Sequence, residues 1–577
     1  KPSAMQKPCS TKLDANSPLY IIKPFKMKKT ILSFMLLIFT IGAFAQNASM
    51  QKTAKAVFTL TTFNKDGSLK ASSHGIFVSA DGQAVSTWAP FSGADHAIVI
   101  DAEGKQHKVE TIIGANELYD VCKFTVSGTT LPAPIAENQT TGKAFLVGYG
   151  NPKASIKALN IQKVEKFMGQ YNYYIFSQDA PENMNGCPFV NERAQVIGLL
   201  QHGKQGEVYA TDVRLDNSLK ANAFSINDPV LRTCAIRTAL PEKQDEALLT
   251  MMMTGETTDS LKREAYIDDF IKRFPTATEG YSTKAMSYVN AGKYAEADKM
   301  MQTAIERATK KDEAHSEYAK VILQKQIYHP DNSYPAWTLD KALEEAQKAE
   351  NINPLDVYRH QQAQIIYAQK KYQQAYDRFM ALTKSPIRNG EFFYEAAQCK
   401  TMLKAPQTEI MALLDSAVAA CPQPLTSVAA PYVLARGMAL DSQEQYRAAL
   451  KDYNLYDSLM QGRPLTSDFY YMRYKCENKT RQYLQALNDI ARAIILTPDE
   501  PTYYAEMASL SLRVKHLEDA EKAAQRCTEL APEYPDGHLL LGIAQLELGK
   551  KETARLSLLK AKELGDKRAD EYLKRIK

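Results

Sequence analysis

The sequence predicts two parts of different fold classes, an N-terminal part made of β-strands and a C-terminal array of α-helices. Three observations lead to this prediction. With 577 residues, the chain is too long for a single hydrophobic core. Short runs of β-branched and aromatic residues, separated by Gly, Asp and Asn turns, fill residues 54–236 and suggest a sandwich or a pair of barrels. Amphipathic helical patterns follow from about residue 241.

The composition and the charge indicate which kinds of binding partner are expected. Hydrophobic residues make up 45% and charged residues 24% of the chain, as in a soluble globular protein. Residues 1–45 hold seven lysines and one aspartate, so that without them the formal net charge changes from +5 to −1. The basic character therefore belongs to the first segment, and we expect no nucleic-acid partner.

The first segment is interpreted as a targeting sequence. The stretch MKKTILSFMLLIFTIGAFA combines two lysines, an apolar run over residues 31–44, and small residues at Ala43 and Ala45. This is the layout of a cleaved secretory signal, and the run is shorter than the ~20 apolar residues that span a bilayer. We expect a signal peptide over residues 27–45, an over-extended N-terminus without a folded role over residues 1–26, and export to the periplasm or the cell exterior, with no membrane span after cleavage.

The helical half repeats a pattern of small residues. A position that is usually small is followed twelve residues later by alanine and seven residues after that by a second small residue, often with proline beyond it. The three clearest copies are spaced by 34 residues and start at Tyr474, Ala508 and Gly542. Small residues let two antiparallel helices approach closely, and proline ends the second helix. This pattern resembles the tetratricopeptide repeat, which has a period of 34 residues, and predicts an all-α solenoid over residues 241–577.

The resemblance implies a concave groove, lined by the first helix of each pair, that holds peptides or partner proteins. An ordinary solvated helix face explains the candidate groove residues equally well. No cofactor is expected, since no phosphate loop, metal-binding motif or metal-ligand spacing of cysteines occurs. The oligomeric state stays open. Judged by helical position, the candidate groove residues are Tyr471, Lys475, Lys479, Arg513 and His360.

Motifs in the β-rich half resemble the trypsin-like proteases of the Deg, or high-temperature-requirement, type. In that family a GxGFxVSxDG element leads to the catalytic histidine, a later strand begins with the aspartate, and a GNSGGPLxN turn carries the serine. Here SHGIFVSADG matches the first element over residues 73–82, LYDVCKFTV places Asp120 at the head of a strand, and GCPFVN matches the last turn over residues 186–191. The resemblance implies a double β-barrel within a domain over residues 46–240.

The catalytic triad of that family is incomplete in this sequence. The best register puts Ala89 where the family has histidine and Asn185 where it has serine, and Asn183 replaces a glycine of the oxyanion hole. Without an imidazole no group accepts the proton of the nucleophile near neutral pH, and an amide is not a nucleophile. The sequence therefore predicts a pseudoprotease that keeps only Asp120, and a strand-leading aspartate often just binds neighbouring backbone.

Because of Cys187, the hypothesis that this domain is an active enzyme stays open. Cysteine is intrinsically a better nucleophile than serine, and trypsin-fold cysteine proteases exist. However, Cys187 lies one residue before the proline, whereas this fold places its nucleophile three residues before it. Its other interpretation is a buried thiol, or a disulfide with Cys122 or Cys234. The candidate bases for a catalytic thiol are His74, His96 and His202.

Together these features predict an exported protein-binding scaffold, in which an inactive trypsin-like domain and a tetratricopeptide solenoid recruit protein or peptide partners. Two alternatives stay open. One is an active trypsin-fold endopeptidase with a thiol or an unusual nucleophile, to which the repeats deliver substrate. The other is a chaperone-like holdase of the cell envelope. Proteolysis assays separate the enzyme from the other two, and suppression of aggregation separates the holdase from the scaffold.

Overall fold

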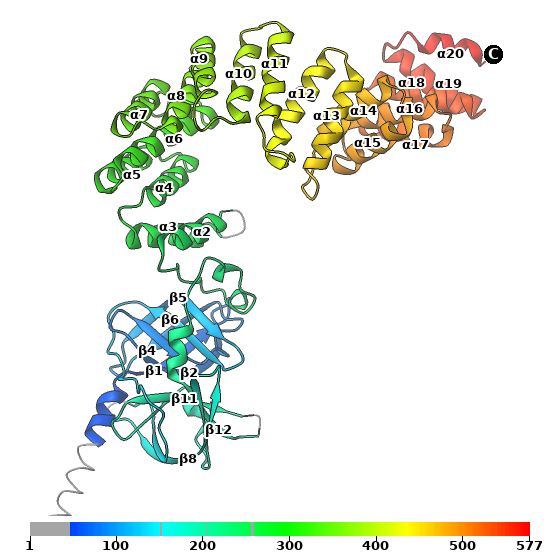
Figure 1. Ribbon diagram of the computed structural model, residues 1–577. Coiled ribbons are helices and arrows are strands. Elements are labelled where there is room, and N and C mark those ends of the chain that lie inside the picture. Colours follow the sequence, from blue (N-terminus) through cyan, green and yellow to red (C-terminus); the bar gives the residue numbers. More distant parts are fainter. Residues whose placement is uncertain (1–46, 151–152, 204, 256–258, 577) are drawn as a thin grey trace, which may run out of the picture. The chain divides into compact units, whose positions relative to one another are not determined.

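The computed structural model describes residues 47–150, 153–203, 205–255 and 259–576 (Figure 1). The predicted signal peptide and over-extended N-terminus lie outside these residues. The chain divides into two compact units, Lys1–Pro275 and Thr276–Lys577. Within the described ranges, no helix is both long and apolar enough to cross a membrane.

The first unit contains two closed β-barrels of six strands each, with every neighbouring pair of strands antiparallel. The first barrel, in the order β1-β2-β3-β6-β5-β4, comprises β1 (Val57–Phe63), β2 (Leu69–Phe77), β3 (Gln83–Ser86), β4 (His96–Ile100), β5 (Gln106–Asn116) and β6 (Val121–Val126). The second, in the order β10-β11-β12-β9-β8-β7, comprises β7 (Lys143–Val147), β8 (Ile156–Phe167), β9 (Tyr171–Phe176), β10 (Pro188–Val190), β11 (Val196–His202) and β12 (Val208–Asp212). Closure leaves no free sheet edge in either barrel. The predicted double barrel is confirmed.

Alternating apolar residues along the strands fill the barrel interiors. In the first barrel, the ring centroid of Phe58 lies 4.8 Å from that of Phe77 and 6.0 Å from that of Phe124. Gly75 of β2 makes this packing possible, because a Cβ there would lie 2.4 Å from the carbonyl oxygen of Val85 and 2.5 Å from the Phe58 ring. A glycine of the SHGIFVSADG motif therefore has a packing role in the barrel core.

Short helical segments complete the first unit. Leu231 and Cys234, at the last 3-10 turn, pack into the core of the first barrel. Among the described residues from 177 to 275, these segments are η1 (Glu182–Met184), η2 (Val213–Ser218), η3 (Ser225–Asn227), η4 (Leu231–Thr233), α2 (Gln244–Met253) and α3 (Ser260–Arg273).

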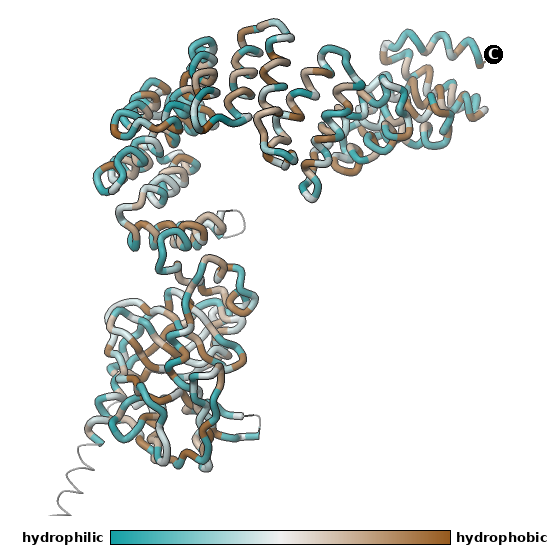
Figure 2. The backbone as a smooth tube through the Cα atoms, in the orientation of Figure 1, coloured by the Kyte–Doolittle hydropathy of each residue, from teal (hydrophilic) through white to brown (hydrophobic). Residues whose placement is uncertain are grey.

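The second unit is all-α, and its successive helices pack as antiparallel hairpins (Figure 1). Figure 2 shows hydrophobic and hydrophilic residues alternating along these helices, as expected of helices that bury one face. The elements are α4 (Thr278–Asn290), α5 (Tyr294–Arg307), α6 (Lys311–Tyr328), α7 (Leu339–Ile352), α8 (Asp356–Ala368), α9 (Tyr372–Leu382), α10 (Gly390–Met402), α11 (Gln407–Ala419), η5 (Ser427–Ala429), α12 (Ala430–Ser442), α13 (Tyr446–Leu459), α14 (Ser467–Lys479), α15 (Tyr483–Leu496), α16 (Pro501–Arg513), α17 (Leu517–Leu530), α18 (Pro535–Glu547), α19 (Lys551–Glu563) and α20 (Ala569–Arg575).

The repeated small residues lie where the two helices of a hairpin come closest. Ala554 and Ala561 of α19 are fully buried. A Cβ on Gly542 of α18 would lie 2.6 Å from Cγ of Leu558, and a Cβ on Gly437 of α12 would lie 2.9 Å from the ring of Tyr453. Close packing of helices is therefore the physical cause of the 34-residue pattern.

A polar pair with at least one buried partner also recurs between the two helices of a hairpin. In three hairpins the residue just before the first small position contacts the side chain 16 residues later, which lies on the second helix. This pairing helps to set the register of the two helices. The pairs are Gln362 with Arg378 at 3.0 Å, Arg436 with Asp452 at 2.7 Å and Arg473 with Asp489 at 2.6 Å.

Candidate functional site

Two of the three triad positions are in direct contact. The backbone N–H of Ala89, an exposed residue, donates to Oδ1 of Asp120 at 2.7 Å. Asp120 directly precedes β6, has a φ of +48°, and reaches the Ala89 segment with its half-buried side chain. Burial raises the pKa of the Asp120 carboxyl, while hydrogen bonds from the N–H groups of Ala89 and Trp88 oppose that shift. The carboxyl group of Asp120 thus binds the backbone of the segment in which the sequence comparison expected a histidine.

The third position, Asn185, lies in the turn that leads into β10 of the second barrel. Its carbonyl oxygen accepts hydrogen bonds from the N–H of His74 at 2.9 Å and from Oγ of Ser73 at 3.1 Å, both on β2 of the first barrel. The Ser73 hydroxyl also lies 2.9 Å from Oγ1 of Thr87, two residues before Ala89. The structure therefore brings all three triad positions to the junction of the two barrels.

Backbone groups of this turn form hydrogen bonds with one another. The N–H of Asn185 donates to the carbonyl oxygen of Glu182 at 3.2 Å, and the N–H of Cys187 donates to that of Met184 at 2.9 Å. In an acyl-transfer site the N–H of the nucleophile position has to stabilise the oxyanion. Gly186 has a φ of +82°, and a Cβ there would lie 2.2 Å from the carbonyl oxygen of His74. The turn is thus built around glycine, but its Asn185 N–H is already bonded.

The three candidate bases bind groups other than a thiol. Nε2 of His74 lies 3.0 Å from the carbonyl oxygen of Asn183, and burial lowers the pKa of this imidazole. His96 contacts Asp95 at 3.0 Å, and Nε2 of His202 lies 3.1 Å from the carbonyl oxygen of Ala180. The geometry gives each histidine a structural partner.

Cys187 lies inside the apolar core of the second barrel. It is fully buried and belongs to the same cluster of apolar side chains as Phe176 and Phe189, whose rings stack with centroids 4.1 Å apart. All seven cysteines in the described residues are free, so Cys122 and Cys234 are not bonded to it. Burial raises the pKa of the Cys187 thiol to about 12. A thiol without charge and without solvent contact is a poor nucleophile.

We expect Cys187 of the native protein to resist alkylation by iodoacetamide at pH 8. With a pKa of about 12, roughly one thiol in 10⁴ is ionised at that pH. Peptide mass spectrometry measures the modified fraction, with Asn138→Cys at an exposed position as the reactive control and guanidinium-unfolded protein as the fully modified one. Native labelling of Cys187 as fast as that of the Asn138→Cys thiol would show an accessible nucleophile.

The candidate groove residues of the helical unit fall into separate repeats. On α14, Nζ of Lys475 lies 5.0 Å above the centre of the Tyr471 ring, and the Tyr471 hydroxyl lies 3.5 Å from Oε1 of Glu506 on α16. Lys479 at the end of α14 and Arg513 at the end of α16 are exposed. The structure thus connects Tyr471 with Lys475, whereas His360 lies on α8 in another repeat.

His360 lines a cavity of about 590 Å³ formed by α6, α8, α9 and α10. Ile327, Tyr328 and Val357 contribute apolar surface and are each more than half exposed. A concave surface that combines apolar side chains with a few polar groups suits a peptide or another amphiphilic ligand. The polar side chains of this cavity are Ser316, Lys320, Gln324, His360, Gln361, Gln364, Glu395 and Gln398.

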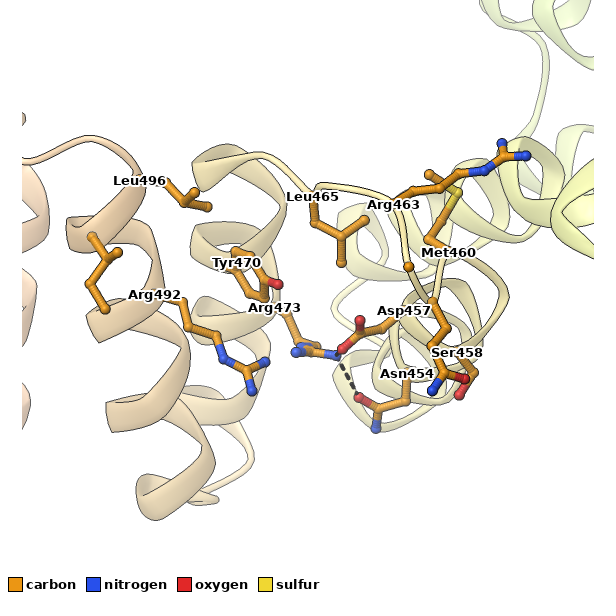
Figure 3. A pocket seen from close by; sticks show the side chains of 13 residues that line it. Asn454, Asp457, Ser458, Met460, Arg463, Leu465, Tyr470, Arg473, Arg492 and Leu496 are labelled. Carbon is orange, nitrogen blue, oxygen red and sulfur yellow. Dashed lines mark hydrogen bonds and ion pairs between the residues drawn. The ribbon is translucent and has the colours of Figure 1, made fainter. Parts of the chain in front are cut away.

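A second cavity, of about 730 Å³, lies between α13, α14 and α15 (Figure 3). Its central charge is Arg473, which donates to Asp457 at 2.8 Å and to Asn454 at 3.2 Å. On its buried side, Nε of Arg473 also donates to Asp489 at 2.6 Å. The guanidinium therefore holds the helices together, and sequence reasoning missed it because its partners lie 16 or 19 residues away on other helices.

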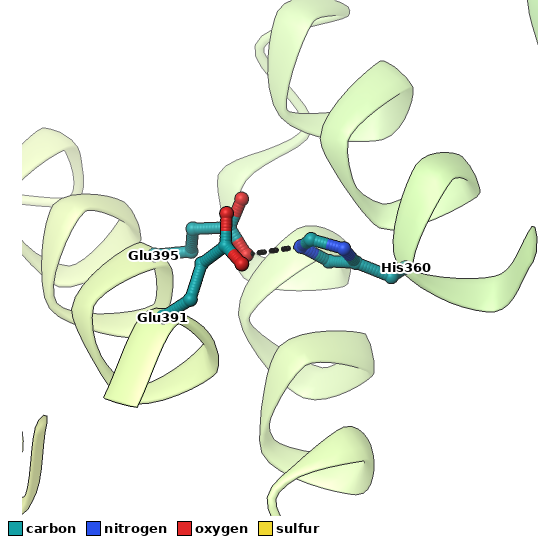
Figure 4. Close-up of side chains that lie close together, drawn as sticks. All are labelled: His360, Glu391 and Glu395. Carbon is teal, nitrogen blue, oxygen red and sulfur yellow. Dashed lines mark hydrogen bonds and ion pairs between the residues drawn. The ribbon is translucent and has the colours of Figure 1, made fainter. Parts of the chain in front are cut away.

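Three side chains of the helical unit have the chemistry of metal ligands. His360 on α8 and the pair Glu391 and Glu395 on α10 place one ligand atom each within 4.8 Å of one another (Figure 4). Sequence reasoning selected His360 alone. It expected no metal site, because no short motif connects a histidine with glutamates 31 and 35 residues further along the chain.

Two comparisons with known proteins found a similarity to this chain. A family model described as tetratricopeptide repeat matches residues 506–569, from within α16 to the start of α20. Among solved structures, the chain is similar to the serine endoprotease from Yersinia pestis, with 17% sequence identity and a TM-score of 0.26. That match covers 32% of this chain and 66% of the endoprotease chain. A search of curated proteins found no match.

The class follows from fold and topology. The chain is a pair of closed antiparallel six-stranded barrels followed by an array of helical hairpins. This arrangement fits a trypsin-like domain joined to a tetratricopeptide repeat region.

Proposed function

We propose that this protein is an exported scaffold that binds proteins or peptides and whose trypsin-like domain does not cleave them. The observation that carries this proposal is the content of the three triad positions at the barrel junction. They hold an alanine, an asparagine and a carboxylate that accepts a hydrogen bond from the Ala89 N–H. Acyl transfer needs a nucleophile and a base that activates it, and the residues at these three positions supply neither.

The helical unit supplies the binding surface of the proposed scaffold. Tetratricopeptide repeats are associated with protein interactions, and the cavity at His360 offers exposed Ile327, Tyr328 and Val357 beside four glutamine side chains. Amide side chains can both donate to and accept from the backbone of an extended peptide. Export is part of the proposal because residues 27–45 have the layout of a secretory signal.

The first experiment incubates the purified chain, starting at Gln46, with unfolded casein, beside Asn185→Ala and Cys187→Ala variants. We expect no cleavage by any of the three proteins, because neither residue is activated as a nucleophile. Cleavage that only Cys187→Ala abolishes would establish a thiol endopeptidase and overturn the proposal. The same samples, heated with an aggregating client protein, test the holdase alternative by light scattering.

The binding arm of this experiment uses an array of unstructured peptides. Val357→Glu places a charge in the apolar part of the cavity. This substitution is expected to weaken the affinity for peptides that the original chain binds at least about tenfold. Leu559→Glu changes a similarly exposed apolar residue on α19 and is the matched control. Equal binding by both variants would remove the His360 cavity from the proposal.

A further inference from the structure

Three potential ligands converge between neighbouring repeats. Nε2 of His360 lies 2.6 Å from Oε2 of Glu395. Glu391 precedes Glu395 by four residues on α10, so both carboxylates lie on one helix face. Figure 4 shows the imidazole from α8 and the two carboxylates from α10 pointing toward one another. The ligand atoms of all three residues lie within 4.8 Å of one another.

The charges in this cluster do not balance. Two carboxylates face a single imidazole, and the remaining hydrogen bond to Glu395 comes from the neutral amide of Gln364 at 2.8 Å. Two negative charges four residues apart on a helix repel each other. A cation placed between them would remove this repulsion.

A second histidine–glutamate contact lies in the neighbouring repeat, and lysines compensate the negative charge of its glutamate. Nδ1 of His315 lies 2.6 Å from Oε2 of Glu345, as close as His360 lies to Glu395. Glu345, however, also pairs with Lys341 at 2.8 Å and with Lys348 at 2.9 Å. Where the first pair has two lysines, the His360 pair has a second carboxylate.

We propose that His360, Glu391 and Glu395 bind a divalent transition-metal ion, with Zn²⁺ as the preferred ion. One imidazole nitrogen with two carboxylate oxygens suits zinc, whereas Ca²⁺ and Mg²⁺ favour ligand sets made of oxygen alone. Zinc–ligand distances of about 2.1 Å place tetrahedral ligand atoms roughly 3.4 Å apart. The ion takes the place of the hydrogen bond between His360 and Glu395, and the side chains need to move by only about 1 Å.

The fourth position of this site is open. His360 and Glu395 both line the cavity of about 590 Å³, so a water molecule or a donor from a bound molecule can complete the coordination. The idea that a side chain of a bound peptide supplies the fourth ligand of the metal ion rests on the proposed peptide-binding function. The metal site itself does not, since its ligands all come from this chain.

Isothermal titration of the full, tag-free and chelator-treated chain with ZnCl₂ tests the site without any peptide. We expect saturable zinc binding that His360→Asn, Glu391→Gln and Glu395→Gln each weaken at least about tenfold. Glu391 is exposed, so its replacement by glutamine leaves the packing intact. His315→Asn, which removes the lysine-compensated counterpart, is expected to keep the affinity of the original chain.

Two results would overturn the inference. One is the absence of saturable zinc binding, and the other is equal affinity in the original chain and in Glu391→Gln and Glu395→Gln. Titration with MgCl₂ provides the comparison of ions, and tighter Mg²⁺ than Zn²⁺ binding would contradict the proposed preference. Because the readout contains no peptide, failure of the peptide array leaves the zinc result standing, and failure of zinc binding leaves the scaffold proposal standing.

Discussion

Arg473→Ala is expected to lower the free energy of unfolding of the helical unit by about 3–5 kcal/mol. Its side chain is only 7% exposed and pairs with Asp489, which is 5% exposed, and with Asp457. These hydrogen bonds and ion pairs raise the pKa of Arg473 and oppose the effect of burial, so the guanidinium stays charged. Removal of one partner of a buried pair leaves the other as an uncompensated charge. Chemical denaturation followed by circular dichroism at 222 nm measures the loss.

Arg492→Ala is the matched control for this prediction. Arg492 lies 3.8 Å from the same Asp489, but its side chain is 53% exposed. Exposed pairs contribute about 0–1 kcal/mol because water screens them, so this variant is expected to unfold almost as the original chain does. If both substitutions lowered the free energy of unfolding equally, burial of Arg473 in the packed interface would not explain its contribution to stability.

Glu477→Gln is expected to stabilise the helical unit in a way that grows with pH. Glu477 is 5% exposed, and its Oε2 has no hydrogen-bond partner within the described residues. Burial, followed by the negative charge of Asp489, raises the pKa of Glu477 to about 8, while Arg473 and Arg492 oppose the shift. The folded state therefore binds a proton that the unfolded state releases above its ordinary pKa of 4.5.

The sign of the effect follows from this difference. The stability that Glu477 contributes is fully present below about pH 4.5 and is lost as the pH rises through about 8. Glutamine keeps the shape and cannot ionise, so the variant should gain about 2–5 kcal/mol over the original chain at pH 9 and far less at pH 5. Denaturation at pH 5, 7 and 9 measures the gain. Glu533→Gln, at an exposed position, is the control, and parallel pH curves for Glu477→Gln and the original chain would contradict the prediction.

Parts of the barrel junction could be predicted from sequence motifs. SHGIFVSADG and GCPFVN lie in segments whose shape depends on glycine, at Gly75 and Gly186, and such positions are visible in a sequence because no other residue fits them. The register that selected Ala89 and Asp120 names two residues that the structure joins by a hydrogen bond. That the Asn185 N–H bonds to Glu182 could not be predicted, because it depends on a 3-10 turn that the motif does not specify.

The groove candidates show a different limit. Helical position selected His360 and Tyr471, but it could not show that one lines a cavity and the other binds its neighbours Lys475 and Glu506. Such differences arise from side chains of adjacent repeats, which a period of 34 residues describes only on average.

The sequence by itself determined the fold class, because strand alternation, helical periodicity and the spacing of small residues are local properties that each segment carries. It could not determine that Glu391 and Glu395 meet His360, or that Glu477 is buried beside Asp489. Those contacts depend on how one helical hairpin stacks on the next. Local patterns specify which face of a helix is apolar, but only the packing of many side chains determines which polar groups of neighbouring repeats come into contact.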